Sequence, residues 1–65
     1  MIEPTHKPSI PCDIDGNAFM IMGTVHKALR KAGADQEYID KYTKEAQSGD
    51  YDHLLRTTMD YVNFE

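Results

Sequence analysis

Several features that mark other classes of protein are missing from this sequence. It contains a single cysteine, Cys12. One cysteine cannot form an internal disulfide, so the fold has to be stabilised by helix packing, a bound ion or association with another chain. The longest apolar run covers only residues 18–22, far short of the roughly 20 residues that span a bilayer. The first residues also lack the basic start and apolar stretch of a secretion signal, and we therefore expect a cytoplasmic protein.

The sequence also lacks a concentration of positive charge. Seven Lys and Arg residues stand against eleven Asp and Glu residues, which gives a formal net charge of −4. Because affinity for nucleic acid depends mainly on clustered Lys and Arg, this composition disfavours DNA or RNA as a partner. A chain of 65 residues has room for one domain, and we assign residues 1–65 to it. The core of so short a chain is thin, so self-association is a candidate source of stability.

Proline is confined to the beginning of the chain, at Pro4, Pro8 and Pro11. Proline has no backbone donor, and it pushes the residue before it into an extended conformation. The sequence therefore predicts a non-helical N-terminal arm, with residues 1–9 flexible.

Two short segments near the chain ends have apolar residues at every second position. The first contains Ile10, Cys12 and Ile14, and the second contains Val62 and Phe64. This period is typical of a strand with one buried face. The two segments are candidates for a short two-stranded pairing, although isolated ribbons of this length are only marginally stable in water.

The rest of the chain has the pattern of amphipathic helices. Apolar residues recur at steps of three and four over about residues 18–32, 36–47 and 51–61,. The links between these segments are short, which favours helices that are neighbours in space. We predict a mainly α fold: a compact three-helix unit with an extended N-terminal arm.

Cap residues support these boundaries. The three segments are preceded by short polar side chains that accept hydrogen bonds from the free amides of a first helical turn: Asn17, Asp35 and Asp50,. Gly33 and Gly49 follow the first two segments, as is typical of C-terminal caps.

The segment from Asp13 to Asn17 resembles the aspartate motif of haloacid-dehalogenase-type phosphatases. That resemblance implies that Asp13 attacks phosphorus and Asp15 handles the leaving-group proton. The strands and later acidic residues of such an enzyme are not predicted. The segment is also similar to half of a calcium loop, but Ala18 and Thr24 stand where an EF-hand has Gly and Glu. We favour a turn and helix cap. The remote alternative is a metal site around Asp13 and Asp15, or an enzyme centred on Asp13, Asp15 and His53.

The soft metal ligands are Cys12, His6, His26 and His53. None of them forms a pair at the spacing of a zinc site. We therefore expect no metal and no cofactor, and we interpret Cys12 as a packed small residue and the histidines as surface residues.

Phe19, Met20 and Gly23 lie off the main apolar stripe of the first helix. A glycine inside a helix costs about 0.5–1 kcal/mol relative to alanine, so its presence indicates that another backbone approaches closely. Two explanations stay open. Either the N-terminal arm covers this patch with Ile10 and Ile14, or a partner does.

The first helix ends in a small basic group: His26, Lys27, Arg30 and Lys31. A solvated helix end accounts for it, and nucleic-acid contact is the alternative. Three short helices with tight turns are similar to a helix-turn-helix module. However, the polar face of residues 51–61 offers Arg56 against Asp52 and Asp60, which is the wrong charge for a DNA groove.

Two blocks of sequence carry a resemblance to a known group of proteins. They are residues 16–23, with GNAF followed by IMG, and residues 48–55, SGDYDHLL. Over about residues 12–62 the chain resembles a family of small phage, prophage and bacterial proteins. The resemblance implies a cytoplasmic location in a bacterial host, and it brings no activity, cofactor or catalytic residue.

These blocks are also predicted turn and cap regions. If the third helix packs across the first, Tyr51 and His53 lie near Asn17 and Phe19. The candidate interaction surface is then Asn17, Phe19, Met20, Gly23, Tyr51 and His53. We interpret the chain as a non-enzymatic protein-interaction or accessory module, with a second copy of itself as one candidate partner. The alternative is a nucleic-acid-associated regulator that uses the basic end of the first helix.

Overall fold

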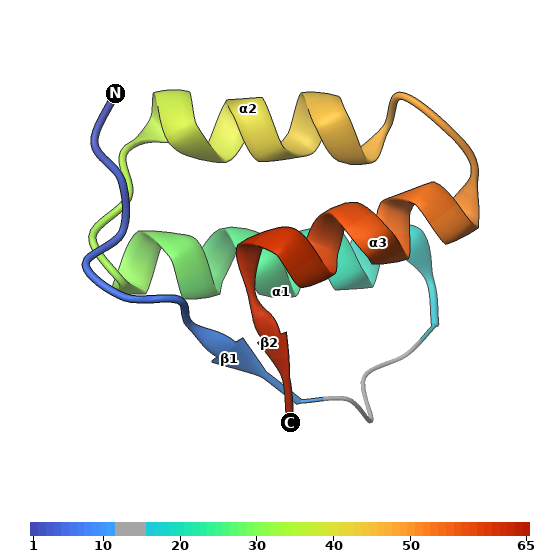
Figure 1. The fold of residues 1–65 in the computed structure, drawn as a ribbon, viewed down its shortest axis with the longest axis horizontal. Coiled ribbons are helices and arrows are strands. Elements are labelled where there is room, and N and C mark those ends of the chain that lie inside the picture. The colour runs from blue at the N-terminus through green and yellow to red at the C-terminus, as the bar shows by residue number, and fades with distance from the viewer. Residues whose placement is uncertain (12–15) are drawn as a thin grey trace.

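The fold consists of three helices and a short ribbon made by the two ends of the chain (Figure 1). The computed structural model describes residues 1–11 and 16–65. Its elements in chain order are β1 (Ser9–Ile10), α1 (Ala18–Lys31), α2 (Gln36–Ala46), α3 (Tyr51–Tyr61) and β2 (Asn63–Phe64). The three predicted helices are confirmed, with boundaries within one residue of those expected from the sequence. The mainly α fold class is confirmed with them.

The predicted N-terminal caps are present in all three helices. The Asn17 side chain accepts from the Phe19 amide at 2.8 Å. Asp35 accepts from the Tyr38 amide at 2.9 Å, and Asp50 accepts from the His53 amide at 2.9 Å. Each bond satisfies a donor that has no partner inside the helix, which explains why the helices begin where they do.

The two predicted C-terminal glycines behave differently. Gly33 has a φ of +101° and is the one residue of the described chain in the left-handed region. It therefore ends α1 as predicted, because glycine adopts this conformation without strain. Gly49 does not share this conformation, and the cap of α2 is Gln47, whose amide donates to Thr43 and Glu45 carbonyl oxygens. The prediction of Gly49 as the C-cap is wrong, because α2 ends at Ala46, three residues earlier, and Gln47 is its cap.

The core lies between the inner faces of the helices, and the ribbon contributes to it. Its fully buried side chains come from all parts of the chain: Ile10, Val25, Leu29, Ile39, Tyr42, Thr58 and Val62. Val25 and Leu29 are four residues apart in α1, and Ile39 and Tyr42 are three apart in α2, so each pair lies on one face of its helix,. The predicted periodicity therefore identifies the core correctly.

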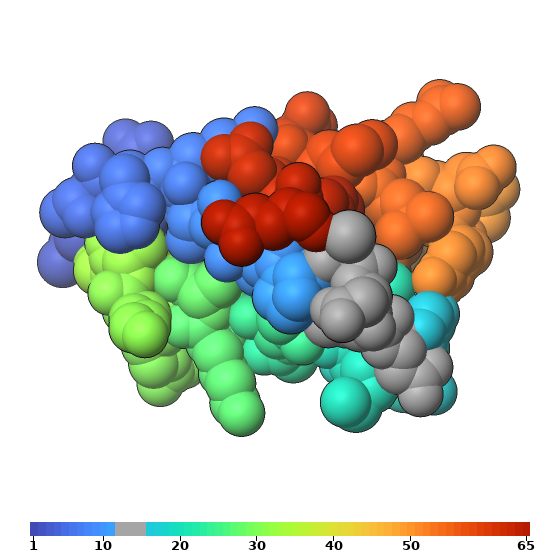
Figure 2. All heavy atoms as spheres, turned by 90° about the horizontal axis from the view of Figure 1, so that it is seen from below, coloured from blue at the N-terminus to red at the C-terminus, as the bar shows by residue number. Residues whose placement is uncertain are grey.

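The chain ends pair as two parallel strands, with Ser9 opposite Asn63 and Ile10 opposite Phe64. The Asn63 amide donates to the Pro8 carbonyl oxygen and the Glu65 amide to that of Ile10, both at 2.9 Å. Figure 2 shows the blue segment that contains β1 beside the red C-terminal segment on one face of the molecule. The pairing is stable in this context because the strands contact α1 and α3 instead of standing alone in water,. Of the apolar residues expected in the first strand, Cys12 and Ile14 lie outside the described residues.

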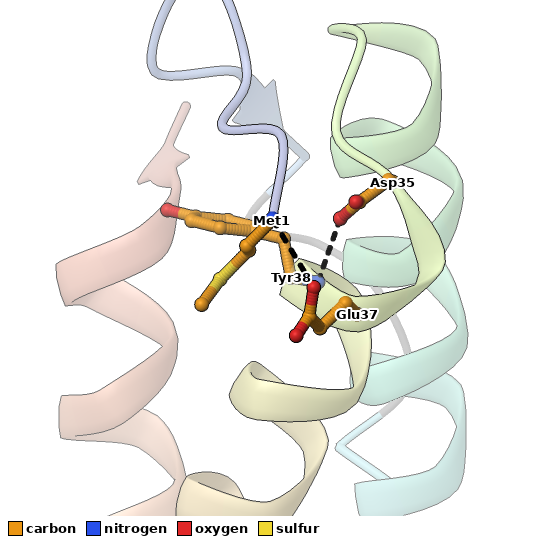
Figure 3. Close-up of polar contacts among 4 residues, drawn as sticks. All are labelled: Met1, Asp35, Glu37 and Tyr38. Carbon is orange, nitrogen blue, oxygen red and sulfur yellow. Dashed lines mark hydrogen bonds and ion pairs between the residues drawn. The ribbon is translucent and has the colours of Figure 1, made fainter.

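The first residues of the arm cross the link between α1 and α2. The Thr5 amide donates to the Ala32 carbonyl oxygen at 2.9 Å, and the Asp35 amide donates to that of Ile2 at 3.1 Å. The terminal amino group lies 3.1 Å from the Glu37 carboxylate (Figure 3). The bond to Glu37 and the charges of Glu37 and Asp35 raise the pKa of this amino group. These contacts do not test the flexibility predicted for residues 1–9, which stays a prediction.

The helices are short and amphipathic,. Within residues 1–11 and 16–65, none of them combines the length and the apolar character needed to cross a bilayer.

Candidate interaction surface

The start of α1 presents two large apolar side chains to solvent. Phe19 is 78% exposed and Met20 is 55% exposed, whereas the next two residues, Ile21 and Met22, are buried in the core. The Asn17 cap sets where the helix begins and therefore which residues face outward,. We call Phe19, Met20 and Gly23 the α1 patch.

A shallow hollow of about 200 Å³ lies over the α1 patch, bordered by Thr24 and Lys27. Among residues 1–11 and 16–65, no heavy atom beyond the neighbouring helical residues lies within 4 Å of the position that a Gly23 Cβ would occupy. The packing of the described chain therefore does not require a glycine here. Ile10, which was considered as a cover for the patch, is instead buried in the core at 2% exposure, and Ile14 lies outside the described residues.

The structure brings the two sequence blocks together at Tyr51. The Tyr51 hydroxyl donates to the Gly16 carbonyl oxygen at 2.6 Å. The ring is 44% exposed and borders a second hollow of about 300 Å³, which includes Ala18, Met22 and Leu54. The α1 patch and Tyr51 thus flank the first turn of the same helix.

His53 takes a different position. Its Nε2 lies 2.9 Å from the Glu45 carbonyl oxygen and 2.9 Å from the Ser48 hydroxyl oxygen. The Ser48 hydroxyl itself donates to Glu45 at 2.7 Å, so its oxygen is free to accept from the protonated Nε2. The ring therefore donates to a carbonyl oxygen in the last turn of α2, and it lies at the α2–α3 link.

The basic end of α1 forms a hollow of about 410 Å³ from His26, Lys27, Arg30 and Lys31. Only part of this group is free to bind a ligand. The Arg30 guanidinium donates to the Gln36 side-chain oxygen at 2.6 Å. The Lys27 and Lys31 side chains extend from the exposed face of the helix.

His26 was expected on the surface, but its ring is only partly exposed because it packs between α1 and α2. Its Nε2 lies 2.6 Å from the Thr43 hydroxyl oxygen. Its ring packs edge-to-face with the Tyr42 ring, and the two ring centroids are 6.0 Å apart. Thr43 donates its own proton to Ile39 at 3.0 Å, so the histidine is the donor in this pair. Burial lowers the pKa of His26, and the Arg30 charge lowers it further.

A cluster of tyrosines, Tyr38, Tyr42 and Tyr61, lies between α2 and α3. Tyr61 packs edge-on against Tyr42 at 5.1 Å and against Tyr38 at 5.6 Å. Its hydroxyl donates to the Glu45 carboxylate at 2.6 Å, and burial together with this bond raises its pKa. The signal for Tyr61 was its spacing of seven from Leu54, on the face that α3 turns to the core.

The remote alternatives for a site involve Asp13, Asp15 and Cys12, which lie outside the described residues. Within residues 1–11 and 16–65, no three His, Cys, Asp or Glu side chains are grouped so that they could hold a metal ion. His53, the third member of the enzymatic alternative, is bonded at the α2–α3 link.

The chain was compared with known proteins in three ways. No family model, curated protein or solved structure matches it. Its partners therefore have to be inferred from its own surface.

Proposed function

We propose that this protein is a small protein-interaction module that docks a partner protein on the α1 patch. The observation that carries the proposal is the 78% exposure of Phe19 beside the half-exposed Met20. Aromatic and methionine side chains are enriched at protein interfaces, where their burial supplies much of the binding energy. The exposure of two such neighbouring residues on a small acidic protein supports the proposal that a partner covers them.

Gly23 gives the proposal a second support. It lies one turn after Phe19, in the middle of α1, where glycine costs about 0.5–1 kcal/mol relative to alanine. Its missing side chain leaves open space at the hollow. A partner backbone that approaches at Gly23 while Phe19 enters the partner accounts for both residues.

The proposal also includes a cellular setting. The sequence blocks that resemble small phage and bacterial proteins include the α1 patch and Tyr51. We place the module in the cytoplasm of a bacterial host, where it acts as an accessory protein.

Site-specific photo-crosslinking tests the proposed surface. A benzophenone amino acid replaces Phe19 in one variant and Met59, which is 50% exposed on α3, in a control variant. We expect an adduct with a different protein from position 19 and not from position 59. Adding Met20→Glu to the first variant should abolish it, because a carboxylate in an apolar contact is costly to desolvate.

Three results would contradict the proposal. The same adducts from positions 19 and 59 would show non-specific contact. An adduct that survives Met20→Glu would show that the patch does not form the interface. An adduct of two copies of the chain, with a dimer in sedimentation, would show that the patch serves self-association instead.

A second candidate function is supported by the hollow formed by the basic end of α1. We propose nucleic-acid association there as the alternative. It predicts a gel shift of DNA or RNA that weakens steeply with salt, because bound phosphates release counterions. The absence of a shift at low salt would remove this candidate.

A further inference from the structure

A groove of about 560 Å³ runs between the N-terminal arm and α1. Its floor is apolar and is formed by Ile10, Ala28 and Ala32. The bond between Thr5 and the Ala32 carbonyl oxygen holds the arm at one end, and the β1–β2 pairing holds it at the other. Its volume falls within the roughly 300–1,000 Å³ of sites for small ligands, which suits a few residues of an extended peptide.

The rim of the groove has one sign of charge. Lys27 and Lys31 line it from α1 and His6 lines it from the arm, and among the lining residues within 1–11 and 16–65 there is no Asp or Glu. The whole chain carries a net charge of −4, so this rim differs from the average surface. Lysines beside a groove attract carboxylates and disfavour cationic ligands.

The arm also offers a backbone edge to the groove. The carbonyl oxygens of Pro8 and Ile10 point to β2, where they accept from Asn63 and Glu65. Backbone groups alternate in direction along a strand, so the amide and carbonyl of Ser9 point to the opposite edge. Ser9 is exposed and lines the groove. Pro11, the next residue that faces this edge, has no amide, so strand addition cannot continue past Ser9 in that direction,.

We propose that this groove binds a short, extended, acidic segment of another protein. The segment pairs with the Ser9 backbone, rests an apolar side chain on Ala28 and Ala32, and brings carboxylates to Lys27 and Lys31. This mode of binding extends an exposed sheet edge by one strand. The groove adjoins the hollow of the α1 patch and shares Thr24 and Lys27 with it, but Phe19 and Met20 do not line the groove. Binding here therefore does not depend on Phe19 or Met20.

The test uses nuclear magnetic resonance of the ¹⁵N-labelled full chain and the acidic peptide Glu-Asp-Ile-Asp-Glu. The uncharged peptide Gln-Asn-Ile-Asn-Gln is the comparison. We expect the acidic peptide to shift the amide signals of Ser9, Ala28 and Ala32, and the uncharged peptide to bind at least about fivefold more weakly.

Two variants provide a matched control. Lys31→Glu reverses a charge in the last turn of α1, and Lys44→Glu reverses one in the last turn of α2, away from the groove. Both changes affect a helix end in the same way. We expect Lys31→Glu to weaken peptide binding about fivefold or more, and Lys44→Glu to change it less than twofold. Lys31→Gln removes the charge without reversing it and perturbs folding less. We expect it to weaken peptide binding by an amount between those of the other two variants.

Several outcomes would overturn the proposal. Equal binding of both peptides would show that charge does not select the ligand. Equal losses in Lys31→Glu and Lys44→Glu, or shifts outside the groove, would place binding elsewhere. A uridine oligonucleotide that gives the same shifts at lower concentration would identify nucleic acid as the ligand. Phe19→Ser separates the two proposals, because it should abolish docking on the α1 patch and leave peptide binding unchanged.

Discussion

The Tyr51 hydroxyl donates a 2.6 Å hydrogen bond to the Gly16 carbonyl oxygen, across 35 positions of sequence. This bond joins the first residue of α3 to the turn that precedes α1. It also connects the two sequence blocks, residues 16–23 and 48–55. The first turn of α1, which presents Phe19, is therefore braced from α3 as well as by its own Asn17 cap.

Replacing Tyr51 with phenylalanine removes this bond and keeps the ring. We expect Tyr51→Phe to lower the free energy of unfolding by about 0.5–1 kcal/mol, the low part of the usual range, because Tyr51 is partly exposed. Urea unfolding measures the change. Tyr38→Phe is the control, since the Tyr38 hydroxyl makes no hydrogen bond within the described chain. Equal effects in the two variants would show that the Tyr51 bond does not stabilise the fold.

The helices could be predicted because their determinants are local. A cap such as Asp50 acts on the amide three residues later, and the apolar period decides which face of the same helix is buried. Neither effect depends on the rest of the fold. This is why all three helices begin at the predicted residue.

Other features depend on residues that are far apart in the sequence. His26 is half-buried because Thr43 and Tyr42 of α2 meet its ring, and no property of α1 alone indicates this. The pairing of Ile10 with Phe64 needs α1 and α3 as a support. For the candidate surface, sequence identified Phe19 and Met20 as residues off the apolar stripe, but it could not show that Tyr51 lies at Gly16 while His53 turns to Glu45.

The surroundings of Gly23 and Gly49 differ. We therefore predict that replacing each with alanine changes the free energy of unfolding in opposite directions. Gly23→Ala should raise the free energy of unfolding by about 0.5–1 kcal/mol, because the added Cβ meets open space inside a helix,. Gly49→Ala should lower it by about 1 kcal/mol or more, because its Cβ would stand 2.8 Å from the His53 ring,. Thermal unfolding of both variants measures the difference. A destabilised Gly23→Ala variant would contradict the open space at this site.

The hydrogen bond between Tyr42 and Thr58 is buried, at 2.8 Å. Tyr42→Phe or Thr58→Val alone leaves one buried hydroxyl without its partner, which should cost about 1–3 kcal/mol. The double variant leaves neither hydroxyl, so its loss should be smaller than the sum of the two single losses. Denaturant unfolding of the four proteins gives the coupling energy. Additive losses would mean that the two hydroxyls stabilise the fold independently.

The partly buried ring of His26 predicts a loss of stability in acid. Burial and the Arg30 charge lower the pKa of His26 in the folded chain from 6.5, and only the Asp40 charge opposes them. The unfolded chain therefore binds the proton more readily than the folded chain as the pH falls through 6.5, and the free energy of unfolding decreases in that window. Above it the histidine is neutral in both states and contributes no pH dependence. Thermal unfolding between about pH 5 and 8 should show this decrease in the wild type and a smaller one in His26→Gln, which cannot titrate. The control is His53→Gln at the α2–α3 link. If the decrease disappears in His53→Gln but persists in His26→Gln, the pH dependence does not come from His26 and the prediction is wrong.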